Sequence, residues 1–216
     1  MTANLWVNTE HALAYLRARD TIPHRAEALD VLVELLPPTV ERVLDLGTGD
    51  GSTLAAVLAV RPEATGVGLD FGEEMLQQAR DRFEGDNRVS LGRHDLSEPL
   101  PQDENEHFDL VVSSFAIHHL DPPRQHALYG EVLQRLRPGG RFVNAEHVAS
   151  PTQALHEEFL AALGKRPDED DPSNQLVGTE QHLRWLNACG FVNVECFWKW
   201  RELAVVAGTK PASHVV

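Results

Sequence analysis

Short apolar runs alternate along the chain with longer segments in which apolar residues recur at helical spacing. Within residues 73–83, Met75, Leu76, Ala79 and Phe83 lie on one side of a helical repeat. The pattern predicts strands at 41–46, 64–70, 87–95, 107–116 and 140–148, and helices at 51–60, 73–83, 122–136, 152–163 and 180–188. This alternation of strands and helices is typical of a parallel α/β sheet.

The last part of the chain follows a different pattern. Residues 191–200 and 201–208 are two strand-like runs with almost no connection between them. A parallel crossover needs about a dozen residues or more, so the two runs are predicted to pair antiparallel. We therefore predict a doubly wound, mostly parallel, seven-stranded Rossmann-like α/β sheet with an antiparallel last strand.

The segment before the first strand is helical in pattern at about 9–19 and 24–36, which predicts an N-terminal helical cap over residues 1–38. An α/β sheet does not need these helices, so they are interpreted either as a lid over a ligand site or as a packed cap. Residues 39–216 complete one domain spanning 1–216. Within it, residues 149–182 are predicted to form an insert on the substrate side.

Composition narrows the class of ligand. The 216 residues carry 33 Asp and Glu against 19 Lys and Arg, a formal net charge of −14. Nucleic acids and anionic membranes need a basic face, so we expect neither partner, and expect a monomer or homodimer that binds a small molecule. No signal-peptide pattern and no apolar run near the ~20 residues of a membrane span is found, which predicts a cytoplasmic location.

The most informative stretch leads from the first predicted strand into the next helix and reads Val43-Leu44-Asp45-Leu46-Gly47-Thr48-Gly49-Asp50-Gly51. Glycines let the backbone turn tightly at a strand end, where open α/β sheets bind nucleotide-like ligands. A dinucleotide fingerprint needs a further glycine at position 52, which is Ser52. Asp45 would repel a pyrophosphate and suits a ligand with an ammonium group.

Two further carboxylates lie at the ends of the next two predicted strands. Asp70 follows the glycines by about twenty residues, where a carboxylate accepts hydrogen bonds from ribose hydroxyls. Phe71 beside it suits the face of an adenine, and Asp95 suits the adenine amino group. Asp95 alone is compatible with a solvated strand-end acid, but acids at three successive strand ends indicate a binding site.

These motifs resemble those of the class I S-adenosylmethionine-dependent methyltransferases over most of the chain. Val43–Gly51 is similar to the family's first motif, Gly68-Leu69-Asp70 to its ribose-binding strand end, and Arg93-His94-Asp95-Leu96 to its adenine-edge motif. Phe108–Leu120 is similar to its fourth-strand motif and Leu136–Phe142 to its run into the fifth strand.

The resemblance implies S-adenosylmethionine as cofactor, with S-adenosylhomocysteine as its product. The cofactor-binding residues implied are Asp45, Gly47, Thr48, Gly49, Asp70, Phe71, Met75, Asp95, Leu96 and Ser113. Within the family, the chain is most similar to enzymes that act on small metabolites. The Asn/Asp-Pro-Pro-Tyr/Phe motif of many members that methylate amino groups of nucleic acids is replaced by Ser113-Ser114-Phe115-Ala116.

Candidate catalytic residues follow the fourth and fifth strands. His118 and His119 are predicted to be catalytic, because an imidazole accepts a proton near neutral pH. The alternative is a structural pair that packs beneath the cofactor. His147 is a further catalytic candidate and Glu146 a substrate contact, with a surface pair as the alternative. A divalent-metal cluster of these residues lacks the usual ligand spacing, and no metal is predicted.

Further candidates lie near the N-terminus and among the tryptophans. Tyr15, His24 and Arg25 are substrate-binding candidates, because N-terminal segments cover the site in the resembling family; an ordinary exposed helix start is the alternative. Three tryptophans either line a pocket for an aromatic acceptor or, as we favour, pack helices against the terminal hairpin: Trp185, Trp198 and Trp200.

The sequence thus predicts an enzyme that transfers a methyl group to an O, N, S or C atom of a small-molecule metabolite. Alignment of the reactants supplies much of such catalysis, since well-oriented reactions reach effective molarities of roughly 10⁵–10⁸ M. Two alternatives stay open. One is an enzyme that uses the same cofactor without methylating, as a cyclase or decarboxylase, and the other is a non-catalytic cofactor-binding protein.

Overall fold

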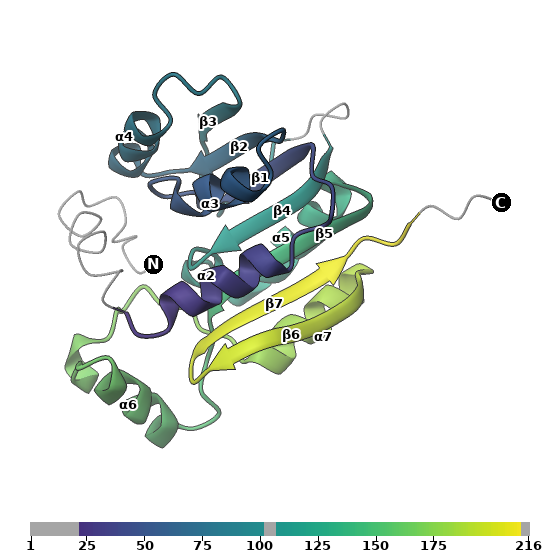
Figure 1. Ribbon diagram of the computed structural model, residues 1–216. Coiled ribbons are helices and arrows are strands. Elements are labelled where there is room, and N and C mark those ends of the chain that lie inside the picture. Colours follow the sequence, from purple (N-terminus) through teal and green to yellow (C-terminus); the bar gives the residue numbers. More distant parts are fainter. Residues whose placement is uncertain (1–21, 102–106, 213–216) are drawn as a thin grey trace.

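A single seven-stranded sheet forms the centre of the protein (Figure 1), whose computed structural model describes residues 22–101 and 107–212. The strand order is β3-β2-β1-β4-β5-β7-β6. β7 pairs antiparallel with both β5 and β6, and the other neighbouring strands pair in parallel. The strands are β1 (Arg42–Leu46), β2 (Thr65–Asp70), β3 (Val89–Arg93), β4 (Phe108–Ser114), β5 (Leu136–His147), β6 (Val192–Trp200) and β7 (Leu203–Thr209). The expected fold class, including the antiparallel last strand, is confirmed.

Successive residues of the central strands face opposite layers of helices. Val43 of β1 belongs to the apolar cluster under α2 (Arg25–Glu34) and α3 (Ser52–Val60), whereas Leu44 belongs to the cluster under α5 (Pro122–Arg135) and α7 (Thr179–Cys189). Phe142 and Val143 of β5 divide in the same way. Because side chains alternate along a strand and both faces are covered, these strands are apolar at nearly every position.

The strand order reverses between β1 and β4, which are neighbours in the sheet. In open α/β sheets the carboxyl ends of the strands at such a reversal are where ligands bind. α4 (Glu73–Arg82) packs beside β2 and β3, and the short 3₁₀ helix η3 (Ile117–His119) follows β4. The fold therefore places the glycine-rich segment, the end of β2 and the His118–His119 pair at one edge of the sheet.

β5 is longer than the sequence pattern predicts, beginning at Leu136 rather than Gly140. Leu136 already pairs with Phe108, and the register shifts before the regular pairing begins. Gly139 has a φ of 81°, and its amide donates a hydrogen bond to the carbonyl of Lys210. The Arg-Pro-Gly-Gly sequence is therefore an irregularity within the strand, not its boundary.

The helix expected at 24–36 is present as α2, but it belongs to a helical layer. Ala28 and Leu32 are fully buried, and the helix packs against β5 and β7 (Figure 1). For α2 the packed-cap interpretation is correct and the lid interpretation is wrong. The helix expected at 9–19 lies outside the described residues.

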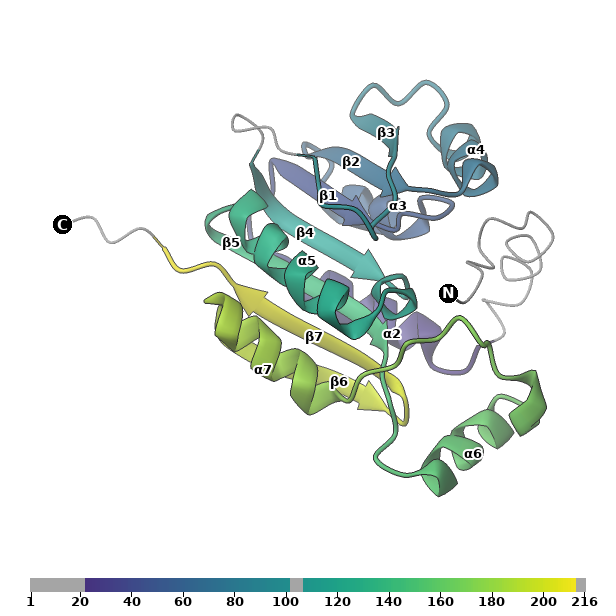
Figure 2. The ribbon, with the colours of Figure 1, turned by 180° about the vertical axis from the view of Figure 1, so that it is seen from behind.

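α6 (Gln153–Ala162) lies apart from both helical layers, as Figures 1 and 2 show from opposite sides. The 3₁₀ turn η4 (Pro167–Glu169) follows it, and residues 173–177, here called the strap, lead back to α7. The amide of Ala149 donates to the carbonyl of Val177, which ties the strap to the end of β5. Nowhere in residues 22–101 and 107–212 is a helix both long and apolar enough to cross a bilayer.

Candidate functional site

Residues 47–51, here called the glycine loop, turn on three glycines with positive φ angles of 67° at Gly47, 56° at Gly49 and 78° at Gly51. A Cβ atom on Gly47 would lie 2.2 Å from the Cβ of Ala116, which precedes η3. A Cβ atom on Gly49 would meet no atom within 4 Å. The glycine loop thus packs directly against the segment after β4, and only glycine fits at position 47.

Asp45 lies beneath the glycine loop with no exposed surface. Its Oδ2 accepts a 2.7 Å hydrogen bond from Thr48 Oγ1, and its Oδ1 is buried without a hydrogen bond of normal geometry in the described part of the chain. Burial raises the pKa of Asp45 to about 7, although the Thr48 hydroxyl and the Leu54 amide lower it in part. Asp45 therefore orders the loop through Thr48 and retains one oxygen that suits a cationic or N–H-bearing group.

Asp70 ends β2 and connects the glycine loop to the start of α4. Its Oδ2 accepts a hydrogen bond from the Gly49 amide and its Oδ1 from the Gly72 amide, each of 2.8 Å. Burial raises the pKa of Asp70 against the effect of these donors. Each carboxylate oxygen has a further lone pair, so this 9% exposed residue is able to accept hydrogen bonds from ligand hydroxyls.

Three other predicted cofactor contacts lie around this loop. Phe71 is partly exposed beside Asp70. Leu96 is buried, and its Cδ1 lies 3.9 Å from the point that a Cβ on Gly47 would occupy. Met75 is buried in α4 next to Gly72. These apolar side chains border the same edge of the sheet as the two carboxylates.

The other two predicted cofactor contacts, Ser113 and Asp95, form hydrogen bonds within the protein. Ser113 is fully buried, and its hydroxyl donates a 2.8 Å hydrogen bond to the carbonyl of Leu46. Asp95 is exposed two residues beyond β3 and accepts a hydrogen bond from the Ser97 amide. The hydroxyl of Ser113 therefore connects β4 to β1. Asp95 lies outside β3, because this strand ends at Arg93 and not at residue 95 as predicted.

His118 and Glu146 face each other at the carboxyl ends of β4 and β5, with Nδ1 and Oε1 2.5 Å apart. His118 is 5% exposed and Glu146 is fully buried. Oε1 of Glu146 also accepts from the His147 amide, and Oε2 accepts from Asn144 Nδ2. Burial lowers the pKa of His118 well below its ordinary value and raises that of Glu146.

Three donors around one carboxylate favour its ionised form. His118 then carries its proton on Nδ1 and donates it to Glu146, as a neutral imidazole. Its Nε2 is left as an acceptor. A buried carboxylate that fixes the tautomer of an imidazole is the arrangement of a general base.

His119 packs beside His118, with ring centroids 4.0 Å apart. Its Nδ1 lies 3.1 Å from Oγ of Ser173 in the strap. Burial lowers the pKa of His119 to about 3, so this imidazole is also neutral near neutral pH. The two histidines lie side by side, and the hydrogen bond to Glu146 is made by His118.

His147 is linked to a second buried carboxylate. Its Nε2 lies 3.0 Å from Oε2 of Glu202, a fully buried residue in the turn between β6 and β7, and its ring lies 5.4 Å from that of His118. The interpretation of Glu146 and His147 as a surface pair is wrong, because Glu146 has no exposed surface. Within residues 22–101 and 107–212, no group of three or more His, Cys, Asp or Glu side chains has an arrangement that could hold a metal ion.

The N-terminal candidates lie near the same edge. The ring of His24 lies 4.4 Å from that of Trp200, and its Nδ1 lies 2.8 Å from Glu27 Oε1. The guanidinium of Arg25 lies 4.8 Å from the ring centre of Phe115, directly after β4. Tyr15 lies outside the described residues.

Two of the three tryptophans considered above pack within the fold, and the third lies at the edge of the site. Trp185 of α7 stacks on His126 of α5, with ring centroids 5.4 Å apart. Trp198 packs against the apolar cluster under α2 and α3. Trp200, at the end of β6, meets His24 and Phe159. The packing interpretation is correct for the first two.

Sequence reasoning missed a buried polar network behind Glu146. Asn144 Nδ2 lies 3.4 Å from the Tyr129 hydroxyl, which in turn lies 2.7 Å from Nδ1 of His182. Burial raises the pKa of Tyr129. A signal was available in Asn144, a polar residue between the apolar residues Val143 and Ala145 of β5. Glu202 carried no such signal, because its partners come from β5 and α6.

Comparisons with known proteins identify the family of the chain. Residues 43–140 match a family model described as a methyltransferase domain. The chain is 32% identical over 198 residues to a demethylmenaquinone methyltransferase of Clavibacter sepedonicus, covering 82% of this chain and 77% of that protein. It is 24% identical over 182 residues to a carboxy-S-adenosyl-L-methionine synthase of Sulfurimonas denitrificans, covering 77% of this chain and 76% of that protein.

Among solved structures, an O-methyltransferase family protein from Burkholderia thailandensis has a TM-score of 0.74 at 20% identity. The match covers 97% of this chain but 64% of the Burkholderia chain, slightly less than two thirds, and it supports the fold alone. The extent and identity of the match to the Clavibacter enzyme establish the family. The chain therefore belongs to the class I S-adenosylmethionine-dependent methyltransferases, and S-adenosylmethionine is its cofactor.

Proposed function

We propose that this protein transfers the methyl group of S-adenosylmethionine to an O, N, S or C atom of a small-molecule metabolite. The observation that carries the proposal is the buried His118–Glu146 pair. His118 lies two residues after Ala116, which packs against Gly47 of the glycine loop. This arrangement combines a neutral, oriented imidazole with the loop on which the family binds its cofactor. When bound, the cofactor supplies an electrophilic methyl group on a sulfonium.

The residues at the ends of β1 and β2 fit this cofactor. Asp70 has lone pairs for ribose hydroxyls, and its two amide bonds hold the glycine loop in place. Asp45 Oδ1 is buried without a hydrogen bond of normal geometry among the described residues, and it is the proposed acceptor for the cofactor's ammonium group. Phe71, Leu96 and the exposed Asp95 are the proposed contacts of the adenine.

His118 is the proposed general base for an acceptor that loses a proton. Glu146 fixes its tautomer, and Nε2 faces away from that carboxylate and accepts the proton. The imidazolium that forms lies next to the carboxylate, which stabilises it. We propose that the acceptor site is bordered by the residues around this base. The rings of His119 and His147 pack near that of His118. His24 packs on Trp200, and Arg25 packs on Phe115.

The acidity of the chain supports a small-molecule acceptor, because a net charge of −14 opposes nucleic acid. The similarity to a demethylmenaquinone methyltransferase points the same way. The second candidate is a non-methylating enzyme that uses the same cofactor, which the similarity to a carboxy-S-adenosyl-L-methionine synthase favours.

Product analysis tests the proposal. The purified protein is incubated with S-adenosylmethionine and a panel of phenols, quinols, amines and thiols, and the products are identified by mass spectrometry. We expect S-adenosylhomocysteine and methylated acceptor in equal amounts. Methylthioadenosine in place of S-adenosylhomocysteine, or no methylated product with any acceptor, would overturn methyl transfer.

Two variants test the base. His118→Gln and Glu146→Gln are each expected to lower kcat by about 10²–10⁴-fold, the usual contribution of a general base, and to leave the Kd of S-adenosylmethionine unchanged. His126→Gln, a control on α5 away from this pair, keeps the wild-type kcat. A wild-type kcat in His118→Gln would remove its role as base.

A further inference from the structure

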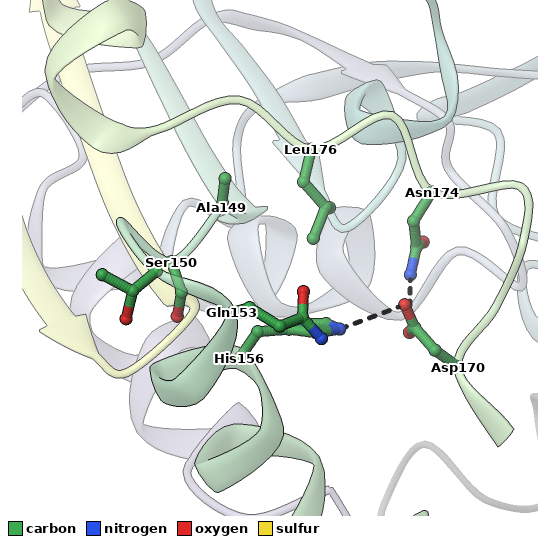
Figure 3. Close-up of a pocket in the computed structure, with 8 residues that line it drawn as sticks. Ala149, Ser150, Gln153, His156, Asp170, Asn174 and Leu176 are labelled. Atoms are coloured by element: carbon green, nitrogen blue, oxygen red, sulfur yellow. Dashed lines mark hydrogen bonds and ion pairs between the residues drawn. The ribbon is translucent and has the colours of Figure 1, made fainter. Parts of the chain in front are cut away.

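A polar pocket of about 240 Å³ lies between α6 and the strap (Figure 3). All of its lining belongs to the insert at 149–182: Ala149, Ser150, Thr152, Gln153, His156, Asp170, Asn174 and Leu176. Sites for whole drug-sized ligands are larger, at about 300–1,000 Å³. A pocket of this size is suited to one group of a ligand, not to a complete substrate and cofactor.

The strap forms a wall shared by this pocket and the histidine pair. Ser173 Oγ contacts His119, and the Gln175 amide donates a 2.8 Å hydrogen bond to the carbonyl of His118. The residues between and after them, Asn174 and Leu176, line the pocket instead. The pocket is therefore one layer of chain away from the proposed base.

The charges around the pocket disfavour anions. His156 lies between two carboxylates, with Nε2 3.4 Å from Asp170 Oδ2 and Nδ1 3.0 Å from Glu202 Oε1. Glu202 has one further imidazole partner, His147. Among the described residues, no Lys or Arg lines the pocket, and Asp170 is its one acidic lining residue. A phosphate or carboxylate group would be repelled by Asp170 without gaining an ion pair to a Lys or Arg side chain of the pocket.

The neutral side chains retain both donors and acceptors. Ser150 donates its hydroxyl hydrogen to Glu202, which leaves its oxygen as an acceptor. Thr152 Oγ1 accepts a hydrogen bond from the Leu155 amide, which leaves its hydroxyl hydrogen as a donor. Asn174 Nδ2 uses one hydrogen for Asp170 Oδ1 and has a second hydrogen and a carbonyl oxygen to offer. A hydroxyl or amide group matches this set, because it also donates and accepts.

We propose that this pocket binds an uncharged, hydroxyl- or amide-bearing group of the methyl acceptor and excludes phosphate and carboxylate groups. That the bound group belongs to a methyl acceptor rests on the proposed function, whereas binding in the pocket requires no catalysis. The acceptor class that follows is a neutral polar metabolite rather than a phosphorylated one.

Backbone-amide NMR tests the pocket with three probes: glycerol, acetamide and inorganic phosphate. Glycerol or acetamide is expected to cause saturable shifts confined to residues 149–156 and 170–176, and phosphate none. Asn174→Lys places a cation in the pocket and is expected to reverse this order. Asp168→Asn is the matched control, because its side chain lies in the same loop but is 71% exposed, and it leaves both results unchanged.

Two outcomes would overturn the proposal: saturable phosphate shifts at these residues in the wild type, or no shift with either neutral probe. Calorimetry with S-adenosylmethionine and the product analysis, made on the same sample, distinguish failure of the pocket proposal from failure of the proposed function. Cofactor binding and methyl transfer without probe binding reject the pocket proposal alone. Probe binding without methyl transfer rejects the proposed function alone.

Discussion

Asp45, Asp70 and Glu146 are buried carboxylates that differ in the number of donors around them. Asp45 receives one hydrogen bond of normal geometry, Asp70 two from amides, and Glu146 contacts from two N–H donors and an imidazole. Burial raises the pKa of all three, and donors oppose that rise. At the residue scale, the site therefore contains three buried carboxyl groups whose ionised forms are stabilised by different numbers of hydrogen-bond donors.

The pKa of about 7 for Asp45 in the folded protein, against an ordinary 3.8, predicts a pH-dependent stability. The folded state binds this proton more tightly, so the contribution is fully present below pH 3.8 and is lost as pH rises to about 7. Three pKa units correspond to at most about 4 kcal/mol. Relative to wild type, Asp45→Asn should gain unfolding free energy as pH rises from about 4 to about 7, measured by urea denaturation. A difference that does not vary with pH would contradict this, and Asp168→Asn serves as the exposed control.

Asp70→Asn should weaken binding of S-adenosylmethionine. An amide nitrogen cannot accept a hydrogen bond, so the variant loses one of the two bonds that hold Gly49 and Gly72, and part of its capacity for hydroxyls. Loss of a hydrogen bond to a charged group, about 1.5–3 kcal/mol, corresponds to an increase in Kd of about 10–100-fold. Isothermal titration calorimetry measures it. Asp95→Asn, at an exposed position, should have a smaller effect, and equal effects would argue against this ranking.

At the scale of elements, the glycine loop packs directly against the segment that leads into η3. The contact between Gly47 and Ala116 sets how closely β1 and β4 bring their loops together, and η3 then carries His118 toward Glu146 of β5. The strap adds a third element, through Ser173 and the Gln175 amide. The position of the proposed base therefore depends on packing between loops that follow different strands.

Gly47→Ala and Gly49→Ala form a matched pair that tests this packing. Both positions have positive φ, so alanine costs each about 1–2 kcal/mol of backbone strain. Only at Gly47 does the added Cβ overlap Ala116. We expect Gly47→Ala to lower the unfolding free energy by a further 1–3 kcal/mol, roughly the cost of overpacking, and to shift the NMR signals of His118. Equal stabilities and unshifted histidine signals in both variants would show that the contact is unimportant.

At the scale of the whole molecule, the sheet packs between two layers of helices, and α6 belongs to neither layer. Helices cover both faces of the sheet, whereas α6 projects from its carboxyl edge (Figures 1 and 2). Its contacts to the rest include the buried Phe159 and Leu160 and the polar contacts of His156. The proposed acceptor side thus combines a fixed sheet edge with a separately attached helix.

Hydrogen exchange should show this division. Amides of β4 and β5 are expected to exchange only through global unfolding, because their strands are central and buried on both faces. Amides of α6 should exchange through a local opening with a clearly lower free energy. Exchange measured by NMR or mass spectrometry decides it, and equal protection of α6 and β4 would contradict the expectation.

The order of strands and helices, the glycine loop and the acids at the ends of β1 and β2 were predictable from the sequence. They depend on periods of two and 3.6 residues and on turn chemistry, which act between near neighbours in the chain. The start of β5 was misjudged because Gly139 and Gly140 also fit a bulge within a strand. The role of α2 was open because a packed cap and a lid share one amphipathic pattern.

Local patterns thus determined the fold class, the family resemblance and the edge of the sheet on which the site lies. The tertiary structure decided which polar groups meet: Glu146 with His118, Glu202 with His147 and His156, and the strap with both His118 and His119. These partners come from segments far apart in the chain. Burial makes each such polar group need a partner, but no local pattern specifies which distant residue supplies it.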